Sequence, residues 1–242
     1  MRPVGRRSLL AGGLFLLLPA CKTTDINNAI GLLGGLGSSG PTGLTTAEIA
    51  QGLKQALSVG TARTVQRVGR QDGYFRDAAI HIFLPDELRD VQETLRFFGL
   101  SALADDVELK LNRAAEQAAD KTKPLFLDAI ARMTLQDVIG IWKGPEDAAT
   151  QYFKRSMTPA LRREVAPVVD RALNAVGALR AYETMMGEYR RLPLVPDVRA
   201  DLRSHAVEKS IAGLFHYVAK EEAEIRRNPA ARSTDLLRRV FA

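Results

Sequence analysis

The chain has 242 residues, of which 46% are hydrophobic, 26% charged and 6% aromatic, with a formal net charge of +6. This composition is typical of a globular protein and excludes the fibrous and disordered classes. A single cysteine excludes an internal disulfide, a thiolate zinc site and an iron–sulfur cluster, because each needs two or more cysteines.

The first 20 residues have the layout of an export signal. Three arginines precede an apolar run from Leu9 to Leu18, and this run is too short to span a bilayer. We therefore expect residues 1–20 to be a cleaved lipoprotein signal peptide. Two adjacent arginines followed by Ser-Leu-Leu also resemble a twin-arginine signal, so the export route stays open between that pathway and the general secretory one.

Cys21 follows Leu18-Pro19-Ala20, a pattern that resembles the bacterial lipobox, in which the cysteine is acylated and becomes the mature N-terminus. Because Cys21 is the only cysteine, the match is more specific than a four-residue pattern alone would be. The alternative is a signal peptide cleaved elsewhere, which leaves Cys21 as a free thiol. Each buried methylene contributes about 0.8 kcal/mol, so two or three palmitate-length chains hold a protein on a membrane. We predict a periplasm-facing membrane lipoprotein, and Lys22 favours the outer over the inner membrane.

Residues 21–44 are rich in glycine, serine and threonine and predict a flexible lipidated tether, with a root-mean-square reach of roughly 25 Å. Glycine patterns within residues 35–42 imitate nucleotide-binding loops, but they follow no predicted strand and lack the phosphate-binding lysine. We therefore assign no cofactor. Removal of residues 1–20 takes away three arginines and no acid, which leaves a charge of +3, and we expect no nucleic-acid partner.

Residues 45–242 predict a single all-α domain of many helices with one short extended segment. Thr45 and Glu48 form a capping box ahead of the first helix. Residues 72–73, Asp-Gly, predict a turn. Apolar and other side chains then alternate over residues 80–84, which predicts an extended piece that ends where Pro85 starts the next helix.

The middle of the chain predicts one long helix and a short one. Gly99 closes the preceding helix, and Ser101 opens a longer one that Pro124 should break or bend. Thr134 with Asp137 predicts a cap for the short helix that follows.

Proline-containing pairs mark the remaining predicted boundaries. Residues 144–145 (Gly-Pro) should start one helix, and residues 158–159 (Thr-Pro) the next. Two prolines at the ends of residues 193–196 bracket a linker before a long terminal helix. Residues 228–229 (Asn-Pro) end that helix, and Thr234 caps a last short one.

The three histidines, His81, His205 and His216, lack clustered metal-binding partners in the sequence. A di-iron bundle needs two Glu-x-x-His pairs, and the chain has none; it also has no Gly-x-Ser-x-Gly nucleophile elbow. We therefore interpret each histidine as structural polarity, expect no metal site, and lean against an enzyme.

The candidate site consists of polar side chains set against the predicted helix cores. These candidates are Asn112, Arg113, Glu116, Asp137, Thr150, Tyr152, Glu221, Arg226 and Arg232. One interpretation gathers them into a polar cleft; the other, which we favour, makes them interhelical ion pairs and caps, since paired charges on helices are common. A basic stripe of Arg63, Arg67 and Arg70 could face lipid headgroups, but a solvated face is the more common reason for such a stripe.

Several motifs lie in these same stretches: residues 112–116 (Asn-Arg-Ala-Ala-Glu), 133–137, 144–153, 213–215, 221–226, 228–232 and 240–241. Together they resemble the bacterial family known as domain of unknown function 4197, and the match covers residues 45–242. Gln55 and the pair Val165-Ala166 depart from the family pattern. The resemblance implies a helical, usually exported protein, and it implies no established activity.

Three functional hypotheses follow. The first is a membrane-anchored binding or scaffold module whose partner is an unknown envelope protein or lipid. The second is a carrier or sensor of an apolar ligand, which needs an apolar cavity of roughly several hundred cubic ångströms. The third is a hydrolase-like enzyme that uses Glu116, Asp137 or Glu221 with Arg226, and it needs these carboxylates to converge.

Overall fold

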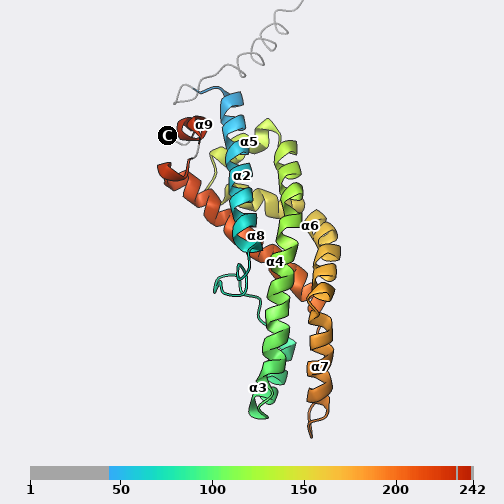
Figure 1. Ribbon diagram of the computed structural model, residues 1–242. Coiled ribbons are helices and arrows are strands. Elements are labelled where there is room, and N and C mark those ends of the chain that lie inside the picture. The colour runs from blue at the N-terminus through green and yellow to red at the C-terminus, as the bar shows by residue number, and fades with distance from the viewer. Residues whose placement is uncertain (1–43, 233, 241–242) are drawn as a thin grey trace, which may run out of the picture. The chain divides into compact units, whose positions relative to one another are not determined.

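The computed structural model describes residues 44–242 except 233, 241 and 242, and those described residues form eight α-helices with no strand (Figure 1). The predicted signal peptide, Cys21 and the tether up to residue 43 lie outside the described residues. The elements are α2 (Thr46–Gly69), η1 (Asp86–Leu88), α3 (Arg89–Phe97), α4 (Ser101–Arg132), α5 (Leu135–Trp142), α6 (Ala148–Ala175), α7 (Ala178–Arg190), α8 (Leu202–Arg227), η2 (Pro229–Ala231) and α9 (Asp235–Val240). The predicted all-α class is confirmed.

Helix α4 lies at the centre of the bundle and contacts α2, α3, α6, α7 and α8 (Figure 1). Its buried face mixes small alanines with Val107, Leu111 and Phe126, which are fully buried. The alanines let neighbouring helices approach closely, and each fully buried Leu or Phe contributes about 2 kcal/mol. Packing around α4 is therefore the main source of the hydrophobic core.

Pro124 does not break α4, so of the break or bend predicted from sequence, the break is wrong. The helix continues from Ser101 to Arg132 through the proline. A proline inside a helix removes one backbone hydrogen bond and costs about 3 kcal/mol. Phe126 and Ile130, both buried just beyond it, offset that cost because they reach the core only if the helix continues.

The predicted helix start at residues 158–159 is also wrong. Helix α6 begins at Ala148, three residues after Pro145, and passes through Pro159 and Pro167. One buried stripe runs along its whole length: Ala149, Thr150, Phe153, Met157, Leu161, Val165, Val169, Ala172 and Leu173. This stripe keeps one face of α6 against α4 and α8, so tertiary packing overrides both prolines.

Most other boundaries lie where the sequence predicts them. Thr45 accepts a hydrogen bond from the Glu48 amide at 3.2 Å and donates its own amide to Glu48 at 2.9 Å. Thr134 and Asp137 form a second capping box at the start of α5. Leu44, which the prediction placed at the end of the tether, is buried with Ile49 and Val240. None of the described helices is long and apolar enough to cross a membrane.

Gly213 on α8 allows the close approach of a buried aromatic ring. A Cβ at this position would lie 2.5 Å from Cε1 of Tyr74. Tyr74 is fully buried, and its hydroxyl donates a 2.7 Å hydrogen bond to the Ser210 carbonyl, so the ring has no free space to move into.

We expect Gly213→Ala to lower the free energy of unfolding by roughly 1–3 kcal/mol, because overpacking shifts the ring or the backbone. Gly140→Ala is the matched control: Gly140 lies exposed in α5 and an added Cβ would meet no atom within 4 Å. Alanine there should stabilise the chain by about 0.5–1 kcal/mol through helix propensity. Urea denaturation measures both, and equal effects of the two variants would contradict this account.

Candidate functional site

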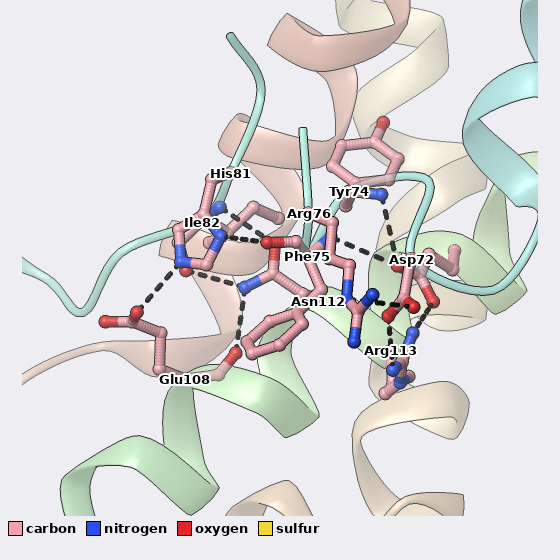
Figure 2. A network of polar contacts seen from close by, with 10 residues as sticks. Asp72, Tyr74, Phe75, Arg76, His81, Ile82, Glu108, Asn112 and Arg113 are labelled. Atoms are coloured by element: carbon pink, nitrogen blue, oxygen red, sulfur yellow. Dashed lines mark hydrogen bonds and ion pairs between the residues drawn. The ribbon is translucent and has the colours of Figure 1, made fainter. Parts of the chain in front are cut away.

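Residues 70–85, which we call the α2–α3 loop, contain no α-helix or strand, and side chains of α4 bind their backbone (Figure 2). These α4 side chains are Glu108, Asn112 and Glu116, spaced four residues apart along the helix. Residues four apart lie on the same face of a helix. Of the candidate residues, Asn112 and Glu116 therefore bind this loop directly, and Arg113 supports it. Glu108 was not among the candidates.

Glu116 is the buried carboxylate of this network. Its Oε1 accepts hydrogen bonds from the amides of Tyr74 at 3.1 Å and Phe75 at 3.2 Å. Its Oε2 accepts from Arg113 at 2.7 Å, and Arg113 also donates to Asp72 at 2.7 Å. A buried charge is tolerated only when it is paired and hydrogen-bonded. Arg113 on α4 supplies the ion pair, and the loop amides supply the hydrogen bonds.

Asn112 holds the extended piece of the loop in the way a neighbouring strand would. Its Oδ1 accepts from the Ile82 amide at 2.9 Å, and its Nδ2 donates to the Ile82 carbonyl at 2.9 Å. The predicted alternation is confirmed, because Ile80, Ile82 and Leu84 are buried and Phe83 is exposed. A side-chain amide can thus replace a β-ladder for a single residue.

His81 links the loop to α4 through one ring nitrogen and binds the loop's own backbone through the other. Its Nε2 lies 2.8 Å from Oε1 of Glu108, and its Nδ1 lies 2.6 Å from the Phe75 carbonyl oxygen. A carbonyl oxygen can only accept, so Nδ1 donates the bond to Phe75.

A second network joins α5, α6 and α8 through Glu222. Its Oε1 accepts from the Ala149 amide and its Oε2 from the Thr150 amide, both at 2.9 Å, and the Thr150 hydroxyl donates to the same Oε2 at 2.9 Å. These amides lie in the first turn of α6, where a helix carries partial positive charge. Glu222 therefore caps α6 from a different helix.

Arg226 and Arg232 cap helix ends of the opposite polarity. Arg226 donates to Glu222 at 3.0 Å and to the Ile141 carbonyl, in the last turn of α5, at 2.8 Å. Arg232 donates to the Ile225 carbonyl at 3.1 Å, in the last turn of α8. Positive charge is favourable at a helix C-terminus, so both arginines stabilise the junctions that they bridge.

Asp137 and Tyr152 form a third, more exposed pair. The Tyr152 hydroxyl lies 3.4 Å from Oδ2 of Asp137. Hydrogen bonds from Thr134 lower the pKa of Asp137, and burial together with the Asp137 charge raises the pKa of Tyr152. Asp137 is therefore an ionised cap, and Tyr152 keeps its proton.

The candidate residues thus fall into separate sets. The first contains Asn112, Arg113 and Glu116, the second Thr150, Arg226 and Arg232, and the third Asp137 and Tyr152. Glu221 lies apart from these sets and pairs with Arg63 at 3.6 Å. Within the described part of the chain these contacts lead to different residues in each set, and the structure does not gather all nine residues around one cleft.

The basic stripe of α2 is partly paired within the domain. Arg67 lies 4.1 Å from the ring centroid of Tyr217 and donates to its hydroxyl at 3.0 Å. The same hydroxyl donates to Asp77. Burial raises the pKa of Asp77, but hydrogen bonds from Tyr217, the Ala79 amide and Arg67 outweigh burial and hold that pKa below its ordinary value.

A hollow of about 490 Å³ opens beside the α2–α3 loop, between η1, α3 and α8. Its lining residues are His81, Phe83, Leu84, Asp86, Glu87, Arg89, Gln92, His205 and Lys209. The loop is fastened to α8 here, because Nε2 of His205 lies 2.8 Å from the Phe83 carbonyl oxygen. The Phe83 ring is 65% exposed and lies 4.5 Å from the His81 ring.

No motif in the sequence marks this hollow. The outward position of Phe83 could be read from the alternation over residues 80–84, but Gln92 and Lys209 lie on different helices and carry no motif. The candidate set includes Glu221 but not its neighbour Glu222, since helical spacing alone does not tell which of two adjacent glutamates faces the α5–α6 junction. Among the described residues, no group of three or more His, Cys, Asp or Glu side chains is placed to hold a metal ion.

Comparison with known proteins identifies one family. A family model described as "Protein of unknown function (DUF4197)" matches residues 43–242. The search of curated proteins and the search of solved structures each found no match.

We expect Glu222→Ala to lower the free energy of unfolding by roughly 3–5 kcal/mol, since it leaves Arg226 and two α6 amides without their buried partner. Glu221→Ala is the matched control on the adjacent residue. Its 3.6 Å pair with Arg63 is partly exposed, so the expected cost is at most about 1 kcal/mol. Thermal and urea unfolding measure both, and a cost for Glu221→Ala as large as that for Glu222→Ala would contradict the assignment.

Proposed function

Because the chain belongs to the DUF4197 family of proteins of unknown function, we propose its role from its own residues. It is a lipid-anchored cell-envelope protein that faces the periplasm, and its helical domain is a recognition module for another envelope protein. The partner binds in the hollow between the α2–α3 loop, α3 and α8. No cofactor or metal takes part.

The anchor rests on the sequence around Cys21. A basic segment, an apolar segment of export length and a lipobox-like tetrapeptide occur in the order that lipoprotein maturation needs. The acylated Cys21 holds the protein on the membrane, and residues 22–43 separate the helical domain from the lipid. Lys22 directs the protein to the outer membrane.

One observation carries the recognition role: the buried carboxylates are bound within the fold, whereas three polar side chains that line the hollow have no partner among the described residues. Glu116 and Glu222 bind backbone amides and arginines. The side chains of Glu87, Gln92 and Lys209 line the hollow without a hydrogen bond or ion pair to any other described residue. A peptide segment offers matching donors and acceptors, and the exposed Phe83 ring offers it apolar contact.

The other two hypotheses receive less support from this arrangement. The cavity between α2 and α8, lined by Leu53, Leu57 and Ile225, measures about 20 Å³, which is room for one water molecule and not for a lipid tail. The larger hollows, of about 480–490 Å³, are each lined in part by charged side chains. Glu116, Asp137 and Glu221 bind different partners, so they do not form the convergent carboxylate site that hydrolysis would need.

We expect Cys21→Ser to abolish acylation and to release the protein from salt-resistant membrane association. Lys22→Asp is the matched control: it should keep the acyl chains and move the protein from outer-membrane to inner-membrane fractions. Intact-protein mass and density-gradient fractionation measure both. A wild-type protein with a free Cys21 thiol would contradict the anchor.

We expect a photo-crosslinking amino acid in place of Phe83 to yield one protein adduct of defined mass in intact cells. Lys209→Glu should lower the yield roughly tenfold, which corresponds to about 1.4 kcal/mol of binding free energy, because it reverses a charge in the hollow. The same cross-linker at Leu135 and the charge reversal Lys121→Glu, both outside the hollow, are the controls. Equal adducts from positions 83 and 135 would contradict recognition at the hollow.

A further inference from the structure

Three large apolar side chains are exposed at the end of α3 and just beyond the end of α7. Phe97 is 84% exposed, Phe98 46% and Leu194 103%. We call these three residues the apolar tip. Helices α3 and α7 contact each other, and both end at the side of the bundle opposite to the start of α2 (Figure 1).

Helix α3 packs on the core through residues other than Phe97 and Phe98. Helix α3 buries Val91 and Leu95, and these two residues already supply its contact with the core. The rings of Phe97 and Phe98 lie 5.2 Å apart and nearly perpendicular, so they pack on each other while much of their surface faces solvent. Such exposure of adjacent aromatic rings commonly marks an interaction surface.

Leu194 is held in an unfavourable backbone conformation. Its φ angle is 60°, the left-handed region that glycine and asparagine adopt more readily than a bulky side chain. The leucine is nevertheless fully exposed, so it gains no burial in return. Strained residues of this kind concentrate at functional sites. We therefore infer that this apolar side chain contacts a partner outside the domain.

The two short segments that hold the tip residues are mainly basic, whereas the adjoining turns of α3 and α4 carry the acids Glu93, Asp105 and Asp106. Residues 96–99 and 190–199 together contain four arginines and one acid, Asp197. Asp197 lies 3.5 Å from Arg199 and 4.0 Å from Arg190, and Glu188 lies 2.5 Å from Arg191. Arg96 has no ion-pair partner among the described residues. Apolar side chains flanked by arginines match an anionic bilayer surface, where the chains insert and the guanidinium groups stay at the headgroups.

The proposed anchor places a bilayer within reach of the tip. Helix α4, with 32 residues, is about 48 Å long, whereas the 23 residues 21–43 can extend to at most about 80 Å. The anchor therefore holds the whole domain close to the membrane, and weak insertion of the tip adds to this attachment. A bilayer also suits side chains that protrude rather than line a groove.

We propose that Phe97, Phe98 and Leu194 insert into the interfacial region of the bilayer that holds the lipid anchor. The domain then contacts the membrane at two places, through the acyl chains and through the tip. This inference rests on the proposed anchor, and the experiment below separates the failure of the one from the failure of the other.

The test uses the mature acylated protein in vesicles of phosphatidylethanolamine and phosphatidylglycerol. Phe97→Cys and Leu194→Cys each introduce one thiol for a polarity-sensitive nitrobenzoxadiazole label; the native Cys21 is occupied by lipid. Leu135→Cys is the matched control, since Leu135 is a 48% exposed leucine on α5. We expect the labels at positions 97 and 194 to shift to shorter emission wavelength and to lose most of their quenching by aqueous iodide, while the control label changes little.

Each alternative outcome has its own signature. Tip labels that remain as accessible to iodide as the control, on a protein that floats with the vesicles, would overturn the insertion. Shielding that appears without vesicles and disappears on dilution would assign the tip to a second copy of the chain instead. If the intact mass shows no acyl chains and no variant floats, the anchor itself fails. Replacement of phosphatidylglycerol by phosphatidylcholine should weaken the shift if the arginines contribute.

Discussion

A helix or loop that ends inside this domain leaves backbone N–H and C=O groups that other residues must bind, because an unpaired buried polar group costs free energy. The domain meets this constraint with long polar side chains from α4 and α8. Glu116 and Asn112 bind the α2–α3 loop, and Glu222 with Arg226 binds the two helix ends at the α5–α6 junction. The apolar core can close only because these groups are satisfied.

The same constraint guides the functional interpretation. A carboxylate whose oxygens already accept hydrogen bonds from backbone amides and an arginine has little capacity left to bind another group. Glu116 and Glu222 are therefore already engaged within the fold. The hollow beside Phe83 and the apolar tip are different, since their side chains are presented to solvent by a loop and by helix ends that the polar networks and the core hold in place.

The local signals in the sequence were sufficient for most of the fold. The Thr45 and Thr134 capping boxes form as predicted because every participating group lies within four residues. The prolines misled the prediction for the opposite reason. Local sequence reports the cost of Pro124 or Pro159 inside a helix, but it does not report the burial that α4 and α6 gain on both sides of the proline.

The sequence by itself determined the helical class, the helix starts marked by side-chain caps, the alternation over residues 80–84 and the polar residues that are now seen in the networks. Only the tertiary structure decided which atoms those residues bind. The backbone amides that Glu116 and Glu222 bind lie about 40 and 70 residues away along the chain, and such contacts depend on how the helices pack. A one-residue shift along a helix turns a side chain by about 100°, which is why Glu222 reaches the α5–α6 junction and Glu221 does not.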